Sequence, residues 1–314
     1  MSIASRQSFT VTTPRGGSVG GMLVLQGVSK AYGQVQALDR VGFEVAPGRL
    51  TGFVGANGAG KTTAMRIVLG VLAADAGQVL LDGAPVTAAD RRGFGYMPEE
   101  RGLYPKMKVL EQVAYLARLH GYSRTEATDR ARALLTRLGL AERLNDLVES
   151  LSLGNQQRAQ LAAAMVHEPS VLILDEPFSG LDPLAVDVVA AVLQERAAAG
   201  ACVLFSSHQL DLVERLCDDL VIIAAGRIRA AGSRASLRSE HAGRRYELVT
   251  DGDLGWVGAE PALDLVRLAD GTAVFDAEDA VAQRVLGTAV AAGQVVRFSR
   301  VQPSLAEIFR EVVA

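Results

Sequence analysis

The segment Gly52–Thr63, GFVGANGAGKTT, contains little side-chain bulk and ends in one lysine and two threonines. Glycines at this spacing before Lys and Thr form the pattern of a phosphate-binding loop. Glycine lets the backbone turn its N–H groups toward an anion, and a helix that begins directly after the loop points its positive end at the same anion. The residues expected to surround the phosphates of a nucleotide are Gly55, Asn57, Gly58, Ala59, Gly60, Lys61, Thr62 and Thr63.

The side chains at the end of this loop have distinct expected roles. Lys61 would reach the β and γ phosphates of ATP, the Thr62 hydroxyl would hold Mg²⁺, and Thr63 would donate to a neighbouring phosphate oxygen. RLTGFVG before the loop reads as a short strand and TTAMRIVLG after it as a helix. A glycine-rich turn that ends in Lys-Thr is the alternative, but the flanking strand and helix favour nucleotide binding.

A second motif, VLILDEPFSGLDP (Val171–Pro183), is an apolar strand that ends in two carboxylates. We expect Asp175 to bind Mg²⁺ through water and Glu176 to act as the general base that polarises the attacking water. Unpaired carboxylates at the end of a buried strand are costly, so a purely structural role explains this pair poorly.

The elements that must position these residues follow an α/β pattern. Strand-like and helical segments alternate over residues 22–230, which is typical of a layered domain with a largely parallel sheet. The pattern is helical from Val109 to Glu149, and we place a helical insertion at about 103–155. The apolar residues expected on one face of its first helix are Val109, Val113, Leu116 and Leu119.

After Gly226 the sequence pattern changes to shorter strand-like segments with one or two helices. This order predicts a small α+β domain over residues 238–314, with a helix over Ala277–Gly287 and a final helix from Pro303. At the other end, residues 1–21 are small and polar with no hydrophobic segment. We therefore interpret them as a disordered leader and not as a signal peptide, with Met22 as a second candidate start.

Composition excludes several classes of function. The formal net charge of -3 gives no electrostatic reason to expect nucleic-acid binding, so phosphate chemistry must be local. No apolar run approaches the ~18 residues needed to span a bilayer. The two cysteines, Cys202 and Cys217, have no metal-ligand spacing around them, so we expect buried thiols in a reducing compartment.

Two further motifs complete an ordered set. LSLGNQQR (Leu151–Arg158) precedes the carboxylate pair, and LFSSHQL (Leu204–Leu210) follows it. With these motifs, residues 22–230 resemble the ATP-binding subunit of an ABC transporter. The resemblance implies a P-loop NTPase fold of the ABC type with a helical insertion, and ATP with Mg²⁺ as the nucleotide and the metal.

The resemblance also implies roles for single residues. Ser152 and Gly154 would belong to the signature motif, which completes the ATP site of a second subunit. His208 would be the switch histidine that contacts the γ-phosphate, although a lone histidine at a strand end can also be a solvated loop residue. Asp182 would lie in the D-loop at the dimer interface or simply form a turn before Pro183. Tyr32 would stack on adenine or be an ordinary strand aromatic.

Two departures from the family pattern concern the ATP site. Glu99 stands where the loop GYMPEERGLYPKM usually carries glutamine, and it could still contact a metal-bound water. A charge about 4 Å from Mg²⁺ or phosphate contributes about 4 kcal/mol, of either sign. Leu153 and Asn155 replace the usual glycine and glutamine of the signature, which puts only the rate of catalysis in doubt. The PEERGLYP segment, the signature and the C-terminal QPSLAEIFREVV resemble the type 2 exporter branch that includes sodium-export and drug-resistance ATPases.

The function implied is ATP hydrolysis by a homodimer that drives a separate transmembrane permease at the cytoplasmic face of the cell membrane, without a nucleic-acid partner. In RGLYPKMKV, the side chains of Arg101, Leu103, Tyr104 and Met107 suit a helix-in-groove contact with that permease or pack the insertion against the body.

A P-loop kinase is one alternative function, but it would leave the signature motif unexplained. A soluble ABC protein of translation or DNA repair is the other alternative, but translation-type members usually carry two cassettes and repair-type members a long coiled coil. Contacts with the transported substrate would lie in the membrane partner.

Overall fold

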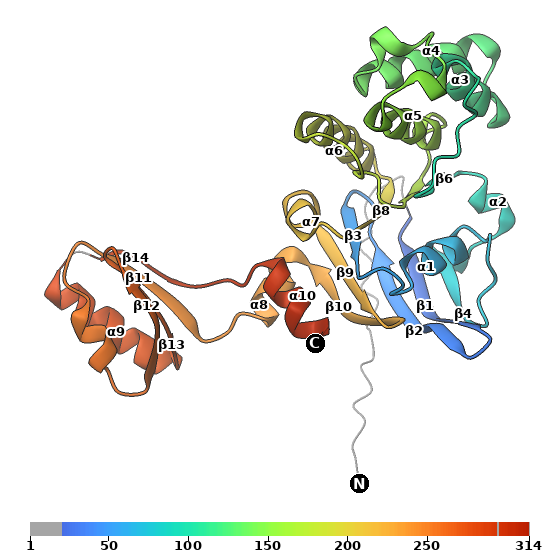
Figure 1. Cartoon of the computed structure of the whole chain (residues 1–314). Coiled ribbons are helices and arrows are strands. Elements are labelled where there is room, and N and C mark those ends of the chain that lie inside the picture. Colours follow the sequence, from blue (N-terminus) through green and yellow to red (C-terminus); the bar gives the residue numbers. More distant parts are fainter. Residues whose placement is uncertain (1–20, 294, 314) are drawn as a thin grey trace.

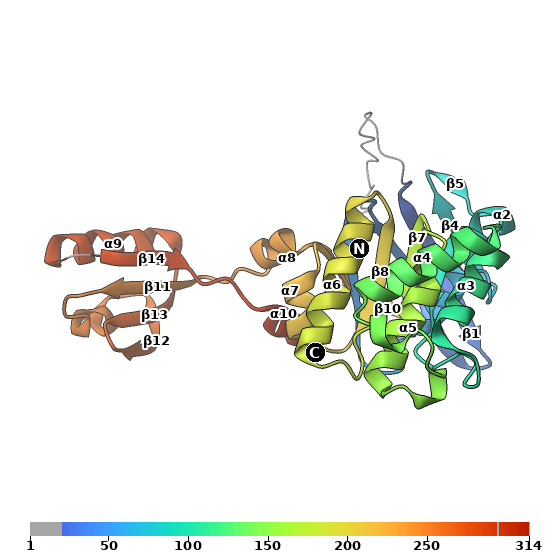
Figure 2. The same cartoon turned by 90° about the horizontal axis from the view of Figure 1, so that it is seen from above.

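The computed structural model describes residues 21–293 and 295–313, arranged as a large body and a smaller C-terminal unit joined by two chain segments (Figures 1 and 2). We call residues 21–240 together with 305–313 the body, and residues 245–300 the C-terminal unit. The leader expected over residues 1–21 lies outside the described residues except for Gly21.

A six-stranded sheet forms the centre of the body. Its strands are, in spatial order, β10 (Arg227–Ser233), β9 (Asp219–Ala224), β3 (Leu50–Val54), β8 (Cys202–Ser207), β7 (Val171–Leu174) and β6 (Phe94–Met97). The strands from β9 to β6 run parallel, and only β10 is antiparallel to its neighbour. Every residue of β3, β7 and β8 is buried, as expected for a parallel sheet covered on both faces. The predicted parallel α/β sheet is therefore confirmed.

One face of this sheet packs against α1 (Lys61–Val68), and a second, antiparallel sheet covers that helix. The second sheet, which the alternation of strands and helices did not reveal, has the order β2 (Val35–Val45), β1 (Leu23–Tyr32), β4 (Ala76–Leu81), β5 (Ala84–Pro85). The Phe43 and Phe53 rings, 5.1 Å apart, join the two sheets beside Met65 of α1. The short α2 (Ala88–Arg91) lies between β5 and β6.

The opposite face of the parallel sheet is covered by α5 (Leu153–Met165), α6 (Pro183–Ala198) and α7 (Leu210–Leu216). The helical insertion above them consists of α3 (Val109–Leu119), α4 (Arg124–Arg137) and the 3₁₀ turns η1 (Ala141–Arg143) and η2 (Val148–Ser150). Within α3, Val109 and Val113 are fully buried, as expected, but Leu119 is 65% exposed. The prediction for Leu119 was wrong, because Ala117 occupies the buried face at the end of the helix.

The C-terminal unit is a four-stranded antiparallel sheet with one helix on one face. The strand order is β12 (Leu263–Ala269), β13 (Thr272–Ala277), β11 (Arg245–Thr250), β14 (Val295–Arg300), and the helix is α9 (Asp279–Ala292). A short 3₁₀ turn, η3 (Gly255–Ala259), precedes β12. Leu248, Phe275 and Val285 are fully buried between the sheet and α9, so the unit has a core of its own.

The last helix, α10 (Leu305–Val313), packs on the body and not on the C-terminal unit, although it follows β14 in the chain (Figure 1). Its apolar residues Leu305 and Ile308 are buried beside α7 and α8 (Arg234–Glu240). Glu214 of α7 accepts a hydrogen bond from the Leu305 backbone N–H at 3.3 Å. The chain therefore leaves the body after α8, forms the C-terminal unit and returns.

Candidate active site

The strand order brings distant motifs together at one edge of the parallel sheet. β8 lies between β3, which precedes the glycine-rich loop, and β7, which precedes the carboxylate pair. In this register Ser206 of β8 pairs with Phe53 and Phe205 pairs with Leu174. The residues that follow β3, β7 and β8 therefore meet at the carboxyl ends of these strands, where open α/β sheets bind ligands.

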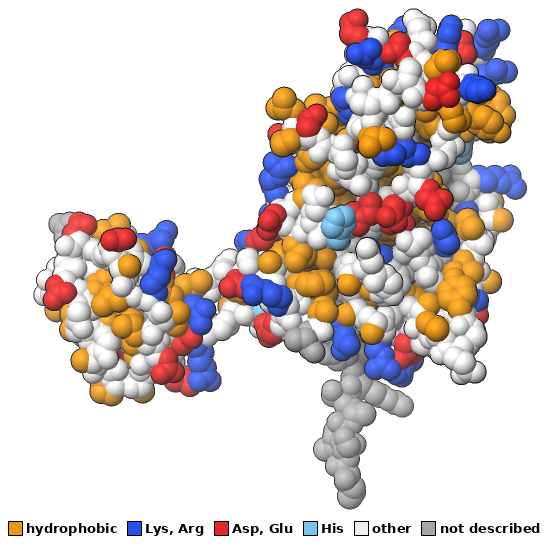
Figure 3. Space-filling model, in the orientation of Figure 1, with side chains coloured by type: hydrophobic (Ala, Val, Ile, Leu, Met, Phe, Trp, Pro, Cys, Tyr) orange, Lys and Arg blue, Asp and Glu red, His pale blue; other side chains and the backbone are white. Residues whose placement is uncertain are grey.

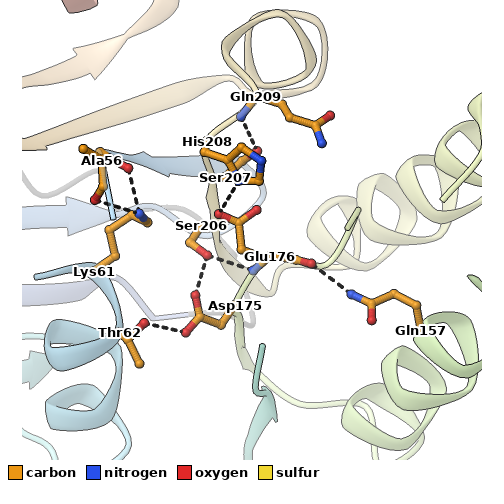
Figure 4. A network of polar contacts seen from close by, with 11 residues as sticks. Ala56, Lys61, Thr62, Gln157, Asp175, Glu176, Ser206, Ser207, His208 and Gln209 are labelled. Carbon is orange, nitrogen blue, oxygen red and sulfur yellow. Dashed lines mark hydrogen bonds and ion pairs between the residues drawn. The ribbon is translucent and has the colours of Figure 1, made fainter. Parts of the chain in front are cut away.

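The glycine-rich loop has the geometry that phosphate binding requires. Gly60 lies in the left-handed region at φ 110°, directly before α1, and a Cβ there would come 2.7 Å from the Ala37 carbonyl oxygen. Lys61 is buried, and its Nζ donates to the carbonyl oxygens of Gly55 at 2.7 Å and Ala56 at 3.3 Å. The loop therefore curls around its own lysine and presents the N-terminus of α1 to the edge of the sheet (Figure 4).

Asp175 is held on both carboxylate oxygens. The Thr62 hydroxyl donates to its Oδ2 at 2.8 Å, and the Ser206 hydroxyl donates to its Oδ1 at 2.6 Å (Figure 4). The Asp175 backbone N–H donates to the Met97 carbonyl of β6 at 2.8 Å. The structure thus brings Thr62 and Asp175, both expected at a metal, into direct contact.

Glu176 occupies an unusual backbone conformation for a residue that is not glycine, with φ 52°. Its carboxylate Oε1 lies 3.0 Å from Nδ1 of His208, which is more exposed to solvent than Glu176. Sparsely populated conformations of this kind cluster at functional sites. The base and the switch histidine expected from the sequence are therefore in contact at the rim of the site.

The donor set around Thr62 and Asp175 fits Mg²⁺. A hydroxyl and a carboxylate are hard oxygen ligands, and Mg²⁺ is usually bound by one or two such protein groups together with substrate phosphates. Within residues 21–293 and 295–313, no cluster of three or more His, Cys, Asp or Glu could hold a metal by itself. Phosphate oxygens would have to complete the coordination.

The two residues expected in the signature motif lie at the start of α5. The Ser152 hydroxyl accepts from the Asn155 N–H at 3.4 Å, as a helix N-cap does. Gly154 is packed so closely that a Cβ would lie 3.2 Å from the Gly180 carbonyl oxygen. Asp182 caps α6 by accepting from the Ala185 N–H at 2.8 Å. These contacts account for local roles and leave the expected roles at a second subunit as predictions.

Four further residues were expected at the nucleotide from the sequence. Tyr32, at the end of β1, is 49% exposed, and the Lys30 ammonium lies 5.9 Å from its ring centre. Asn57 is exposed in the loop, and Thr63 is half-buried in α1. Glu99 is exposed in the loop after β6. Their contacts with nucleotide remain predictions.

Three polar residues near the site were not singled out from the sequence. Ser206 joins both carboxylate residues, since its Oγ also accepts from the Glu176 N–H at 2.8 Å. Gln157 of α5 donates to the Glu176 carbonyl oxygen at 2.9 Å. Gln160, also on α5, donates to the carbonyl oxygens of Pro98 and Glu100 and so anchors the Glu99 loop. All three are buried polar side chains, but a linear sequence does not reveal which polar residues are buried.

The cysteines behave as expected from the sequence. Cys202 and Cys217 are both buried and free. Burial raises the pKa of the Cys202 thiol to about 11 and also raises the pKa of Cys217. Both therefore remain protonated thiols at neutral pH and take no part in the polar network (Figure 4).

This geometry defines a P-loop nucleotide-binding protein, and comparisons with known proteins specify the family. Residues 38–179 match the ABC transporter family, and residues 232–313 match the C-terminal domain of DrrA1-3-like ATP-binding proteins. The ABC transporter ATP-binding protein YhaQ of Bacillus subtilis is 37% identical over 293 residues, which cover 93% of this chain and 98% of the relative. The chain belongs to the family of ABC transporter ATP-binding proteins, whose ATPase domain binds and hydrolyses ATP.

Other relatives and solved structures agree with this assignment. The linearmycin resistance ATP-binding protein LnrL of Bacillus subtilis is 32% identical over 225 residues, 71% of this chain and 72% of that protein. Nod factor export ATP-binding protein I of Paraburkholderia xenovorans is 36% identical over 219 residues, 69% of this chain and 72% of that protein. The solved structure of an ABC transporter ATP-binding subunit matches with a TM-score of 0.65 and 33% identity, over 70% of this chain and 92% of that chain.

Proposed function

We propose that this chain is the motor subunit of an ABC exporter, which dimerises around two ATP molecules and drives a separate transmembrane permease at the cytoplasmic face of the cell membrane. The outward direction is supported by the names of the relatives, which include Nod factor export and linearmycin resistance. No helix within residues 21–293 and 295–313 is both long enough and apolar enough to cross a membrane. A second chain would therefore supply the membrane path.

Hydrolysis would be the in-line attack of water on the γ-phosphate. Glu176 would accept the proton of the attacking water, with His208 3.0 Å from its carboxylate to orient it. Lys61 would stabilise the negative charge on the transferred phosphoryl group, and Thr62 with Asp175 would hold Mg²⁺, which supplies further charge neutralisation when bound. The protein contributes positioning and electrostatics, and water is the nucleophile.

A head-to-tail homodimer would complete each ATP site. Gly154 lies beside Gly180, and Ser152 caps the helix to which Gly154 belongs. In a dimer of the type implied by the family resemblance, these signature residues would face the γ-phosphate bound to the other copy. Leu153 and Leu184, both large and more than half exposed, lie next to the signature and the D-loop and would be covered in that dimer.

The permease contact is carried by one observation, a hollow of about 210 Å³ between the helical insertion and the Glu99 loop. Arg101, Leu103, Glu149 and Gln156 are among the residues that line it. Leu103 also packs against the body, whereas the next residue, Tyr104, is 71% exposed. An exposed aromatic at the edge of a hollow with one basic and one acidic side chain suits an amphipathic helix from a partner.

The test is to purify a tagged chain gently from its native membrane and to identify what accompanies it. We expect a protein with several membrane spans, and we expect Tyr104→Asp to weaken its capture while ATP binding is unchanged. Val71→Asp is the matched control, because Val71 is equally exposed at 74% and does not line the hollow. Recovery of ribosomes or DNA ends with no membrane protein would instead support a soluble ABC protein of translation or DNA repair.

A further inference from the structure

We propose that Ser206 and Gln157 are positioning residues for ATP hydrolysis, which hold the carboxylate of Asp175 and the peptide of Glu176 in place. The inference rests on the proposed roles of Asp175 and Glu176 and goes beyond them. Neither Ser206 nor Gln157 is expected to touch nucleotide, water or metal.

Ser206 is suited to this role by its place in the sheet. It is fully buried near the end of β8, between the strand that leads to Lys61 and the strand that leads to Asp175. Its hydroxyl donates to Asp175 Oδ1 at 2.6 Å and accepts from the Glu176 N–H at 2.8 Å. One hydroxyl thus fixes the metal-binding carboxylate and the backbone of the base at the same time.

The Asp175 carboxylate is immobilised only while both of its oxygens are bound. Thr62 holds Oδ2 and Ser206 holds Oδ1. The Thr62 hydroxyl is itself the expected metal ligand, and it can coordinate a metal through an oxygen lone pair while its proton stays donated to Asp175. Ser206 holds the other carboxylate oxygen, so the two hydroxyls together set the rotation of the carboxylate when metal and nucleotide are bound.

Glu176 needs external support because its backbone lies in the left-handed region. A residue other than glycine persists there only where surrounding contacts fix it. Ser206 holds its N–H, while its carbonyl oxygen accepts from Gln157 Nε2 at 2.9 Å and from the Ser179 N–H at 3.1 Å. Both ends of the residue are therefore fixed, which leaves the side chain directed at His208 (Figure 4).

Gln157 adds a connection to the signature helix. It is 3% exposed on α5, the helix that begins at the signature residues Ser152 and Gly154. A displacement of α5 by nucleotide bound to a second copy would be transmitted through this amide to the peptide of Glu176. Gln157 therefore links the signature of one ATP site with the base of the other.

The first experiment compares Ser206→Ala, Ser206→Thr and the unmodified chain in ATP turnover. We expect kcat of Ser206→Ala to fall about 10²-fold, because small displacements of catalytic groups cost rates of this order, while KM for ATP changes less than about twofold. Ser206→Thr keeps the hydroxyl and should recover most of kcat. Thr51→Val is the control, since the Thr51 hydroxyl on β3 is equally buried and has no hydrogen-bond partner among the described residues.

A second measurement does not depend on turnover. In the Glu176→Gln background, calorimetry measures how much Mg²⁺ tightens ATP binding. We expect Ser206→Ala to reduce this Mg²⁺ effect about 10-fold, as is typical when a group that orients a metal ligand is removed. Gln157→Met should leave the Mg²⁺ effect unchanged, since Gln157 contacts Glu176 and not Asp175.

Gln157→Met is also tested in turnover. We expect kcat to fall about 10-fold with ATP affinity unchanged, because the side chain keeps its volume but loses the amide that holds the Glu176 carbonyl. Gln112→Met on α3 is the matched control, since Gln112 is just as buried and its Oε1 has no hydrogen-bond partner among the described residues. The unfolding midpoint of each variant shows whether the fold is intact, and Ser206→Thr decides the case if Ser206→Ala does not fold.

The outcomes separate this proposal from the function on which it rests. If Glu176→Gln abolishes turnover but Ser206→Ala keeps kcat within twofold and keeps the Mg²⁺ effect, the positioning role is wrong and the base assignment stands. If Glu176→Gln hydrolyses ATP normally, the base assignment is wrong, and the positioning role is wrong with it. Equal losses in Ser206→Ala and Ser206→Thr would also overturn the proposal, because the hydroxyl would not be the cause.

Discussion

The parallel sheet of the body and the antiparallel sheet of the C-terminal unit bury their strands in different ways. All residues of β8 are buried, whereas every residue of β12 after Leu263 is exposed. The body sheet has packed elements on both faces, and the C-terminal sheet has α9 on one face only (Figure 2). Packing on both faces therefore holds the polar groups at the edge of the body sheet among buried, well-packed neighbours.

Charged groups on the two sheets differ accordingly. Asp175 is 1% exposed and held by two hydroxyls, so its orientation is fixed. On the C-terminal sheet, Arg245 pairs with Asp276 across neighbouring strands, and both side chains are more than a third exposed. Surface pairs of this kind contribute little to stability, since water competes for both partners. The comparison indicates that the body carries the chemistry and that the C-terminal unit is an independently packed attachment.

The exposed surface supports the same division. Acidic side chains and a histidine gather along the middle of the body, between the helices above and the sheets below (Figure 3). In the body, His208 is more than half exposed although its partner Glu176 is buried. On the C-terminal unit, basic, acidic and apolar side chains are interspersed on the face shown (Figure 3).

The largest expected effect is at the edge of the body sheet. Glu176→Gln should bind ATP but lower turnover ~10²–10⁴-fold, as is typical when a general base is lost, and should leave an ATP-stabilised dimer visible by size exclusion. Lys61→Ala should instead abolish nucleotide binding, because Lys61 would contact the phosphates themselves. Normal hydrolysis by the Glu176 variant would show that the roles assigned at this edge are wrong.

The second prediction tests whether the core of the C-terminal unit and the core of the body are separate, with one buried residue substituted in each. Phe275→Ala should destabilise the C-terminal unit by about 3–5 kcal/mol and Ile308→Ala should destabilise the body by about 2–5 kcal/mol, since each leaves a cavity. Hydrogen exchange should increase in β11 and β13 for Phe275→Ala, and in α7, α8 and β10 for Ile308→Ala. Increased exchange in the C-terminal sheet of the Ile308 variant would contradict the packing of α10 on the body.

The smallest effect is expected on the exposed sheet face. Hydrogen bonding to Arg245 lowers the pKa of Asp276, so the carboxylate stabilises the fold above its unfolded-state pKa of about 3.9, and this contribution is lost as the pH falls through the lower pKa of the folded state. Asp276→Asn should cost about 0.2–1 kcal/mol at neutral pH and nothing at acidic pH, because the side chain is exposed and screened. The free energy of unfolding of both proteins, measured at neutral and at acidic pH, gives this cost. A larger loss at acidic pH than at neutral pH would contradict the prediction.

Local sequence was sufficient for the parts of the site that are contiguous in the chain. The Gly55–Thr63 loop and the Asp175–Glu176 pair follow apolar strands, and each motif specifies its own backbone geometry and side-chain types. The parallel sheet, the helical insertion and the separate C-terminal strands also follow from hydrophobic periodicity, because burial on one or two faces determines that pattern. At the end of α3 this reasoning failed, because it assigned the apolar residue Leu119 to the buried face although its side chain is exposed.

Only the tertiary structure decided which distant residues meet. The hydroxyl of Ser206 lies between Asp175 and Glu176 because β8 inserts between β3 and β7, and strand order is set by the packing of the whole sheet. The docking of α10 on α7 likewise depends on which apolar surface the other elements of the body leave uncovered. The sequence by itself therefore determined the chemical groups and their local geometry. The fold determined how they are held, because contacts between residues far apart in the chain leave no periodic pattern within it.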